Sequence, residues 1–352
     1  MNNSTLSPPD IAKAYARIKP YIHKTPLLHS NILNEMHNCK IYFKMDALQK
    51  TGAFKIRSVL NHLLELQERG QLPNKIVAYS TGNHALAMSY AAKLFGICAR
   101  VYLPQNVSPI KKQIAVEYGA QVVEVATRAK AEELARKDGN LDFYYLHPSD
   151  NDETIAGAGT LCYEALLELE EMGEKTDAIF GSCGGGGLLA GSYLAKELIR
   201  PTAEIHGVEP AIANDAYLSL SAQNISNGKI FRFTDSPPTI ADGLRTLGVS
   251  ARTLQYLKKL DGFHLVSEEA ILYWTAWLIQ MMKITCEPSA AISMAAAHAW
   301  LQNKCLQGDP QGEDNSANMG ANNKVILILI TGGNLDPEFY HELSNLDLLL
   351  PK

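Results

Sequence analysis

Strand-like apolar runs alternate with helical patterns along most of the chain, and this alternation constrains the fold more than any other feature. The runs are IYFKM (41–45), KIVAYS (75–80), ARVYLP (99–104), QVVEVA (121–126), DAIFGS (177–182), AEIHGVE (203–209) and KVILILIT (324–331). Helical segments such as 84–96 and 188–199 lie between them. This order predicts right-handed βαβ units and an α/β fold with a mostly parallel sheet. Ligands of such sheets bind beyond the carboxyl ends of the strands.

Four consecutive glycines lie at one of these strand ends, before the helical segment LLAGSYLAKELI. They are Gly184, Gly185, Gly186 and Gly187. Glycines let backbone N–H groups turn towards an anion, and a helix N-terminus adds partial positive charge. The pattern therefore predicts a phosphate-binding turn. A Walker loop is excluded because the Gly-Lys-Ser/Thr sequence is missing.

The same turn leaves a dinucleotide site open as an alternative. Gly185, Gly187 and Ala190 match the G-x-G-x-x-A fingerprint, and Glu209 follows about 20 residues later. A NAD-dependent oxidoreductase of this type normally carries its glycine loop near the first strand, whereas here the loop follows residue 180. The position favours a compact phosphorylated aldehyde, and the oxidoreductase is kept as a distant alternative.

The segment TGAFKIRS (51–58) places Lys55 among apolar neighbours. Crowding by apolar groups lowers the pKa of a lysine, and such lysines form Schiff bases with aldehydes. Two other strand ends carry polar groups that suit the same ligand. STGNH (80–84) offers hydroxyls, an amide and backbone N–H groups, and Thr331 offers a hydroxyl after the last apolar run.

Composition indicates which binding partners and which cellular compartment we expect. The 352-residue chain has a net charge of −5 and no lysine or arginine run, so we expect no nucleic-acid partner. No apolar run approaches the ~18 residues of a spanning helix, and MNNSTLSPPD lacks the features of a signal peptide, so we expect no membrane association. The six cysteines are scattered without a CxxC pair, which predicts reduced thiols and a cytoplasmic protein without disulfides or zinc.

Eight motifs then occur in the order of a known family: KTPLLHS, TGAFKIR, STGNH, HPSDNDETIAGAGT, GGGGLLAG, TIADGLR, EPSAA and TGGNLD. Together they resemble the fold-type II pyridoxal phosphate (PLP) enzymes, in the branch that contains threonine/serine dehydratases and serine racemase. The resemblance implies a tryptophan synthase β-like α/β fold with two open, twisted, mostly parallel sheets flanked by helices. It also implies pyridoxal 5′-phosphate as the cofactor, an amino acid as the small-molecule substrate, and a homodimer.

The resemblance assigns roles to the matching positions. It implies that Lys55 binds the cofactor aldehyde and acts as the general base, and that Thr81 is the second catalytic residue. The cofactor-binding residues that it implies are Phe54, Lys55, Asn83, Gly184, Gly185, Gly186, Gly187 and Thr331. The substrate-binding residues that it implies are Ser80, Thr81, Gly82, Asn83 and His84.

A cation site is also implied, for Mg²⁺ or another divalent ion. Its ligands would be Glu209, the carbonyl of Ala213, and Asp215. Oxygen ligands of this kind suit a hard cation that keeps several waters. Ordinary surface acidity after a strand is the alternative interpretation.

The activity that we expect from the sequence is elimination of water from a β-hydroxy amino acid such as L-threonine or L-serine, giving a 2-oxo acid and ammonia. Racemases of this branch carry serine immediately before Gly-Asn-His, and many dehydratases carry alanine. Thr81 keeps the hydroxyl but adds a methyl group and a stiff χ1. Serine racemase activity, alone or beside elimination, and 3-hydroxyaspartate dehydratase activity therefore stay open as alternatives, as do a β-replacement synthase and a non-catalytic cofactor carrier.

Departures from the family pattern affect the expected pocket. Ala53 stands where the family has serine before Phe-Lys, and Leu86 and Ala158 replace common glutamines. These changes predict a drier or differently shaped substrate pocket. For the domains we expect a large cofactor-binding unit of residues 1–72 and 154–352, and a small mobile unit of residues 73–153 that closes over the substrate.

Overall fold

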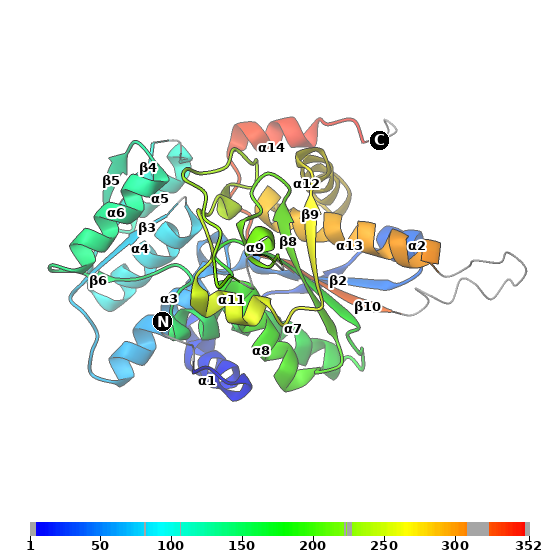
Figure 1. Ribbon diagram of the computed structural model, residues 1–352, viewed down its shortest axis with the longest axis horizontal. Helices are drawn as coiled ribbons and strands as arrows, with labels where there is room; N and C mark the ends of the chain where they lie inside the picture. The colour runs from blue at the N-terminus through cyan, green and yellow to red at the C-terminus, as the bar shows by residue number, and fades with distance from the viewer. Residues whose placement is uncertain are drawn as a thin grey trace, which may run out of the picture.

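The computed structural model describes residues 5–80, 82–105, 107–221, 223, 227–307 and 324–348 (Figure 1). Its strands form two sheets, of six strands in the order β1-β2-β10-β7-β8-β9 and of four strands in the order β5-β4-β3-β6. Among the described strands, β1 and β2 are the one antiparallel pair. The predicted α/β fold with two mostly parallel sheets is confirmed.

The strands have the following bounds: β1 Leu27–His29, β2 Lys40–Met45, β3 Lys75–Tyr79, β4 Cys98–Pro104, β5 Gln121–Val125, β6 Tyr144–Tyr145, β7 Ala178–Ser182, β8 Glu204–Pro210, β9 Gly262–Val266 and β10 Val325–Ile330. The helices have the following bounds: α1 Pro8–Ile18, α2 Asn31–His37, α3 Lys55–Glu68, α4 Asn83–Phe95, α5 Pro109–Glu117, α6 Arg128–Gly139, α7 Asp152–Glu171, α8 Gly187–Ile199, α9 Asp215–Ser219, α11 Ala251–Leu257, α12 Glu268–Met282, α13 Pro288–Gln307 and α14 Pro337–Ser344. The strands that the seven apolar runs predict are present, and β1, β6 and β9 are additional.

The central strand β10 shows why both faces of the six-stranded sheet are covered by helices. Its side chains alternate, so that Leu327 and Leu329 join the core under α1, α7 and α8, while Ile328 and Ile330 join the core under α12 and α13. All six residues of β10 are buried. A strand that is apolar on both faces is typical of the middle of a parallel sheet.

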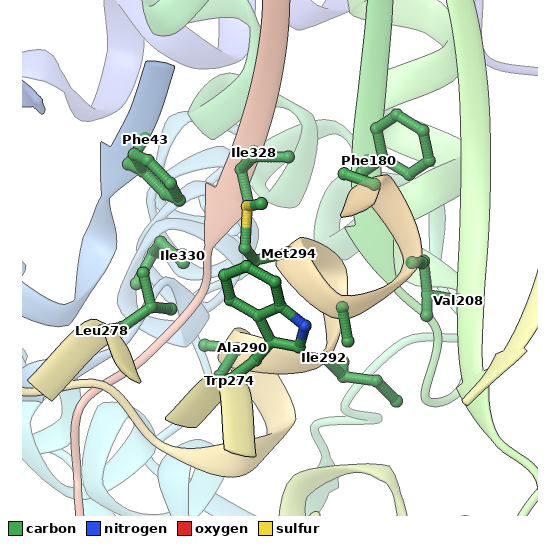
Figure 2. Close-up of a cluster of buried hydrophobic side chains, with 14 of the residues drawn as sticks. Phe43, Phe180, Val208, Trp274, Leu278, Ala290, Ile292, Met294, Ile328 and Ile330 are labelled. Atoms are coloured by element: carbon green, nitrogen blue, oxygen red, sulfur yellow. The ribbon is translucent and has the colours of Figure 1, made fainter. Parts of the chain in front are cut away.

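The second of these cores contains large side chains from strands and helices. Figure 2 shows Phe43, Phe180 and Ile328 of neighbouring strands facing Trp274 and Met294, which come from α12 and α13. All five side chains are buried. This packing fixes the positions at which β2, β7 and β10 end.

The four-stranded sheet forms a separate layered unit, which lies on the left of Figure 1. Ile76 and Ala78 of β3 pack in a core with α3 and α4, and Val77 and Tyr79 pack on the opposite face against α6. The small unit therefore has cores on both sides of its sheet. Its residues fall within the 73–153 segment that the sequence assigns to a small domain, and the division into domains stays a prediction.

A buried ionic network holds the start of α3 in place. Arg57 donates to both carboxylate oxygens of Asp46, at 2.6 and 2.9 Å, and to both oxygens of Glu164, at 3.1 and 3.2 Å. The Nζ atom of Lys44 lies 2.9 Å from Glu164. These residues connect β2, α3 and α7, and Lys55 lies close to the network at the N-terminus of α3.

We expect Arg57→Ala to lower the free energy of unfolding by about 3–5 kcal/mol, because the substitution leaves buried carboxylates without their counter-charge. Denaturant unfolding monitored by fluorescence measures this loss. The matched control is Arg69→Ala, at the C-terminus of α3, whose half-exposed side chain pairs with Glu65 and should contribute no more than about 1 kcal/mol. Equal losses in the two variants would contradict the structural role of the network.

Among the described residues, no helix combines the length and the apolar character needed to cross a bilayer.

Candidate active site

A large pocket lies where strands of both sheets end. It contains about 1170 Å³ of empty space, including its open mouth, which is enough for a cofactor together with a small substrate. Residues at the carboxyl ends of β3, β7 and β10 line it, as do the N-termini of α3, α4, α6 and α8. The lining residues that the sequence predicts are Phe54, Lys55, Ser80, Asn83, His84, Gly184, Gly185, Gly186, Gly187 and Thr331.

Lys55 is the first residue of α3, and its backbone is fixed from the neighbouring sheet. The Phe54 N–H donates to the carbonyl of Thr331 at 2.9 Å, and Ala53 forms an isolated bridge with Gly332. Ala53 is fully buried at this bridge. The serine hydroxyl that this position lacks would therefore lie in a closely packed part of the structure. The backbone pairing places Lys55 beside the end of β10.

The Lys55 ammonium lies inside the pocket, where its Nζ atom donates to the Pro148 carbonyl at 2.9 Å. Nζ also lies 5.0 Å from the centroid of the Phe54 ring. Burial, together with the nearby charge of Arg128, lowers the pKa of Lys55 to about 8. A lysine with this pKa is unprotonated far more often at neutral pH than a surface lysine, as the sequence predicts.

The two middle glycines of the turn are packed closely against neighbouring side chains and leave no room for a Cβ atom without a shift. A Cβ atom on Gly185 would lie 2.2 Å from the Ser149 Oγ atom, and one on Gly186 would lie 2.9 Å from Thr253. Gly186 also has a φ of +81°, which favours glycine. The turn leads directly into α8, a 13-residue helix, so backbone N–H groups and the helix dipole meet at the pocket. These features fit a phosphate group.

The loop before α4 presents a second group of donors. The Ser80 hydroxyl oxygen accepts from the N–H groups of Gly82 and Ala85, at 2.9 and 3.2 Å, so its own proton is available to a ligand. Gly82 has a φ of +148°, and a Cβ atom there would lie 2.5 Å from the Lys111 side chain. Thr81 lies outside the described residues, and its predicted role is not tested by the structure. The loop suits a carboxylate at the N-terminus of α4.

His84, the second residue of α4, is neutral. Its Nε2 atom lies 3.0 Å from the Leu146 carbonyl, which defines Nε2 as the donor. Burial, assisted by the charge of Lys55, lowers the pKa of His84 to about 3. The Nδ1 atom is buried and has no hydrogen-bond partner among the described residues, so it can accept a hydrogen bond from a bound ligand.

Asn83 connects the small unit to Glu287, a carboxyl group for which the sequence predicts no role. Its Nδ2 atom donates to Glu287 at 2.7 Å, and its Oδ1 atom accepts from Asn334 at 2.9 Å. The other Glu287 oxygen is buried and has no partner among the described residues, and burial raises the pKa of Glu287 to about 7. Glu287 belongs to the EPSAA motif, and this motif is the sequence feature that could have indicated its place in the pocket.

The predicted cation ligands lie together outside the pocket lining. Glu209 accepts from the N–H groups of Ala216 and Tyr217, at 3.0 and 2.9 Å, and Asp215 accepts from the Thr246 hydroxyl at 3.0 Å. Both carboxyl groups are fully buried, and the second oxygen of Asp215 has no partner within the described part of the chain.

The two acids also interact. Burial and the charge of Asp215 raise the pKa of Glu209 well above its usual value, and burial raises the pKa of Asp215 to about 6. Among the described residues, no group of three or more His, Cys, Asp or Glu side chains is arranged so that it could hold a metal ion by itself. Two buried acids with one orphaned oxygen fit a cation that takes its remaining ligands from carbonyls and water.

Several pocket residues were not identified from the sequence. These residues are Arg128 and Arg136 of α6, Arg232, His147 and Ser149, and all of them line the pocket. The His147 Nδ1 atom accepts from the N–H groups of Ser149 and Asp150, at 3.1 and 2.8 Å. The arginines of α6 occur in a segment that resembles an ordinary surface helix, so their position depends on the tertiary fold.

Fold and pocket together define a class of protein. It is an α/β protein with two mostly parallel sheets, in which a lysine of lowered pKa and a phosphate-sized glycine turn face one cavity at the strand ends.

Residues 18–315 match the family model described as pyridoxal-phosphate dependent enzyme. The chain belongs to this family, in the fold-type II branch of serine racemases, threonine deaminases and hydroxyaspartate ammonia-lyases, and its cofactor is pyridoxal 5′-phosphate. This membership favours the phosphorylated aldehyde over the dinucleotide as the ligand of the glycine turn.

Individual relatives match over nearly the whole chain. Serine racemase of Dictyostelium discoideum is 36% identical over 341 residues, which are 95% of this chain and 96% of the relative. L-threo-3-hydroxyaspartate ammonia-lyase of Saccharomyces cerevisiae is 33% identical over 337 residues, 94% of each chain. The crystal structure of the threonine deaminase of T.th. has 37% identity and a TM-score of 0.79, with 94% of this chain and 99% of that chain covered.

Proposed function

We propose that the protein removes the Cα proton of a β-hydroxy amino acid. It then either returns a proton to the opposite face, which racemises the substrate, or expels the β-hydroxyl group as water to give an enamine, which is hydrolysed to a 2-oxo acid and ammonia. The lysine of lowered pKa beside the glycine turn is the observation that carries this proposal. Relatives named as racemase and as ammonia-lyase support both outcomes. The 36% identity to a serine racemase favours racemisation over elimination, whereas the sequence predicts elimination as the main activity.

When bound, pyridoxal phosphate makes the Cα proton acidic by delocalising the charge that its removal creates. Groups of the protein itself bind the cofactor and the substrate and move the protons. We assign the phosphate to the turn at Gly184–Gly187 and the substrate carboxylate to the loop at residues 80–84. Lys55, with a pKa of about 8, is then the general base, since a base works best when its pKa is near the working pH. Thr331, at the end of β10, offers a hydroxyl to the cofactor ring.

Racemisation needs a second acid or base on the face opposite Lys55, and we propose Thr81 for this role on the strength of the sequence motif. Thr81→Ala is expected to reduce formation of the opposite enantiomer by at least ~100-fold. Elimination should fall much less, because it needs the lysine face alone. Chiral chromatography of the amino acid and an ammonia assay on the same samples give the two rates. An unchanged ratio of the rates would refute the assignment.

We further propose that residues 73–153 move as a unit to close the pocket. Three contacts between the two sheet units are placed to stabilise a closed form: Asn83 with Glu287 at 2.7 Å, Lys111 with Asp242 at 2.8 Å, and Ser108 with Asp336. Closure would exclude water from the proton transfers at Lys55.

We propose a divalent cation at Glu209, Asp215 and the Ala213 carbonyl. Because burial raises the pKa of both acids, the folded state without a cation binds more protons than the unfolded state. Its stability therefore falls as the pH rises from the ordinary aspartate pKa of 3.8 to about 6, and the loss persists above that pH. Mg²⁺ should raise the melting temperature by roughly 5 °C over a chelator at about pH 8, and much less at about pH 5.

Differential scanning calorimetry of wild type and of the Glu209→Gln/Asp215→Asn double variant measures this effect. The double variant should melt at the same temperature in Mg²⁺ and in chelator. If Mg²⁺ does not change the melting temperature of the wild-type protein at either pH, the proposed cation site is wrong.

The experiment that tests the proposed activity is a product survey. The cofactor-loaded protein is incubated with both enantiomers of serine, threonine and 3-hydroxyaspartate, and each reaction is analysed for the opposite enantiomer, ammonia and 2-oxo acid. We expect at least one substrate to give the opposite enantiomer together with ammonia. If all of these substrates are unchanged while the cofactor absorbance is present, the proposal is wrong.

A further inference from the structure

Two hollows of the protein meet at one buried residue. The first is the main pocket, described above, at the ends of the strands. The second hollow contains about 680 Å³ of empty space, including its open mouth, and its charged lining residues are Lys111, Asp242, Arg245, Glu287 and Asp336. Among the described residues that line either hollow, Glu287 alone is common to both. Glu287 therefore lies between the reaction site and a second opening to solvent.

The carboxyl group of Glu287 is arranged so that it can hold a proton. Its Oε1 atom accepts from the Asn83 side chain at 2.7 Å, and its Oε2 atom is buried without a hydrogen-bond partner among the described residues. A negative charge on such an oxygen is costly, and a proton there removes the cost. Burial raises the pKa of Glu287 to about 7, so that both protonation states are populated near neutral pH.

The charged neighbours of Glu287 partly cancel one another. Burial is the largest influence on its pKa, Lys111 of α5 favours the carboxylate, and Asp242 favours the protonated form. Lys111 and Asp242 also pair with each other at 2.8 Å. On the side of the second hollow, Arg245 and Asp336 are a further pair of opposite charges. The protonation state of Glu287 is therefore not fixed by a single ion pair.

Contacts at the ends of β10 and α4 place Glu287 near the proposed acid and base. A Cβ atom on Gly332 would lie 2.5 Å from the Glu287 Oε1 atom, and Gly332 forms the bridge with Ala53, just before Phe54 and Lys55. Asn83, which donates to the same oxygen, follows Thr81 and Gly82 in the chain. Glu287 is therefore close to both segments that carry the proposed acid and base.

Racemisation through two residues requires a proton donor of this kind. Each turnover leaves Lys55 with one proton more and the residue on the opposite face with one proton fewer, so both must exchange protons with solvent before the next turnover. Lys55 lines the main pocket and can release its proton through the mouth of that pocket. The residues on both sides of Thr81 are buried, with Ser80 6% exposed and Gly82 also buried, so this face needs another route to solvent.

We propose that Glu287 carries protons between the second hollow and the face of the main pocket opposite Lys55, and so restores the proton of Thr81 after each racemisation. The protonated Glu287 carboxyl group gives its proton, directly or through one water, to the deprotonated oxygen on that face. The carboxylate that results then takes a proton from solvent in the second hollow. Both transfers run backwards when the opposite enantiomer is the substrate. The inference rests on the proposed function, in its racemising form.

The first test separates kcat from kcat/KM for the racemisation of serine. Glu287→Gln keeps an oxygen that accepts from Asn83 but has no acidic proton. Because the proton is restored after the product leaves, the variant should lower kcat of racemisation about 100-fold and leave kcat/KM nearly unchanged. Ammonia formation should keep its kcat, because elimination does not use the opposite face. Glu287→Asp, which retains a carboxyl group, should recover part of the racemisation kcat.

The matched control carries the same substitution outside both hollows. Glu268 accepts from the Thr239 hydroxyl and the Ile240 N–H, both at 2.7 Å, and lines neither the main pocket nor the second hollow. Glu268→Gln should leave kcat and kcat/KM of both reactions unchanged.

A small proton donor should replace the missing carboxyl group. Imidazole is partly protonated at neutral pH and can enter the second hollow, so increasing its concentration should raise the racemisation kcat of Glu287→Gln and not that of wild type. Pyrazole, a ring of the same size that stays unprotonated at neutral pH, is the control compound and should have no effect.

Infrared spectra of the cofactor-loaded protein give a readout that does not depend on turnover. Wild type should show the carbonyl band of a protonated carboxyl group, and this band should disappear as the pH rises through neutrality. Glu287→Gln should lack the band, and Glu268→Gln should keep it. The wild-type spectra test the inference even if a variant at position 287 binds the cofactor poorly.

The outcomes separate the inference from the function on which it rests. A Glu287→Gln variant that keeps the racemisation kcat, or that loses kcat and kcat/KM equally, would overturn the inference. Absence of the carboxyl band at every pH, or of any response to imidazole, would overturn it too. If wild type forms ammonia but no opposite enantiomer, elimination stands and the inference is overturned. If the cofactor-loaded wild type changes no substrate, the proposed function itself fails.

Discussion

Replacing Lys55 with alanine is expected to abolish the absorbance band of the lysine-bound cofactor and to lower turnover by about 10,000-fold. Lys55 supplies both the amine that binds the cofactor aldehyde and the proposed base, and its Nζ atom lies in the pocket beside the Pro148 carbonyl. Absorbance spectra and steady-state rates on the same preparation measure the two losses. Lys55→Arg should not rescue either one, because a guanidinium stays protonated.

The control for this variant is Lys93→Ala, since Lys93 is an exposed lysine of the nearby helix α4. We expect normal absorbance and normal rates for it. A Lys55→Ala protein that keeps the absorbance band, or that turns over substrate at a rate near that of Lys93→Ala, would contradict the assignment of Lys55.

Gly185→Ala is expected to weaken cofactor binding by about 3 kcal/mol, or ~100-fold, while the rest of the protein stays folded. The new methyl carbon would lie 2.2 Å from the Ser149 Oγ atom and 3.0 Å from its Cβ atom, so either Ser149 or the glycine turn must shift. We expect the turn to shift, which moves its backbone N–H groups away from the phosphate. Titration of the cofactor-free protein with pyridoxal phosphate, followed by absorbance, gives the change in dissociation constant.

A second substitution makes this prediction specific. Removing the opposing side chain in the Gly185→Ala/Ser149→Gly double variant should restore most of the affinity, because the close contact is with Ser149. If the double variant binds the cofactor as weakly as Gly185→Ala alone, the loss has a cause other than the packing of the turn.

The first half of the fold could be predicted because its local patterns agree with its tertiary environment. The strand-like runs and their helices recur with short connections up to β8, and the structure shows the predicted elements at nearly the predicted bounds. Agreement between apolar pattern and final burial is what makes such elements recognisable. β9 lacks that agreement, because the edge strand GFHLV has one buried residue, Val266. β6 is a two-residue strand, too short to show any alternation.

The helices α12 and α13 were not predicted, for a different reason. α13 lies against both α12 and the six-stranded sheet, and residues 290–297 of it are all buried. A helix surrounded on most sides shows no polar face, so its sequence carries no helical periodicity. Its residues AAISMAAA are consistent with dense packing but specify no element.

Within the site, the sequence identifies residues whose role depends on their immediate neighbours in the chain. It does not identify residues whose role depends on contacts with distant segments. The glycine turn and Lys55 are marked by their immediate neighbours in the sequence. Arg128 becomes part of the pocket because α6 packs on β3 and brings its first residue over Tyr79. Glu287 gains its role from Asn83, which belongs to the other sheet unit. Neither contact has a signature in a single sequence.

The most direct test of the central claim is to find which residue carries the cofactor. The purified holoenzyme is reduced with borohydride, digested, and analysed by tandem mass spectrometry for lysine bearing the reduced pyridoxyl group. The account predicts one modified position, Lys55, and no modification in the Lys55→Ala protein prepared in parallel. A reduced cofactor attached to any other lysine in the holoenzyme would contradict it.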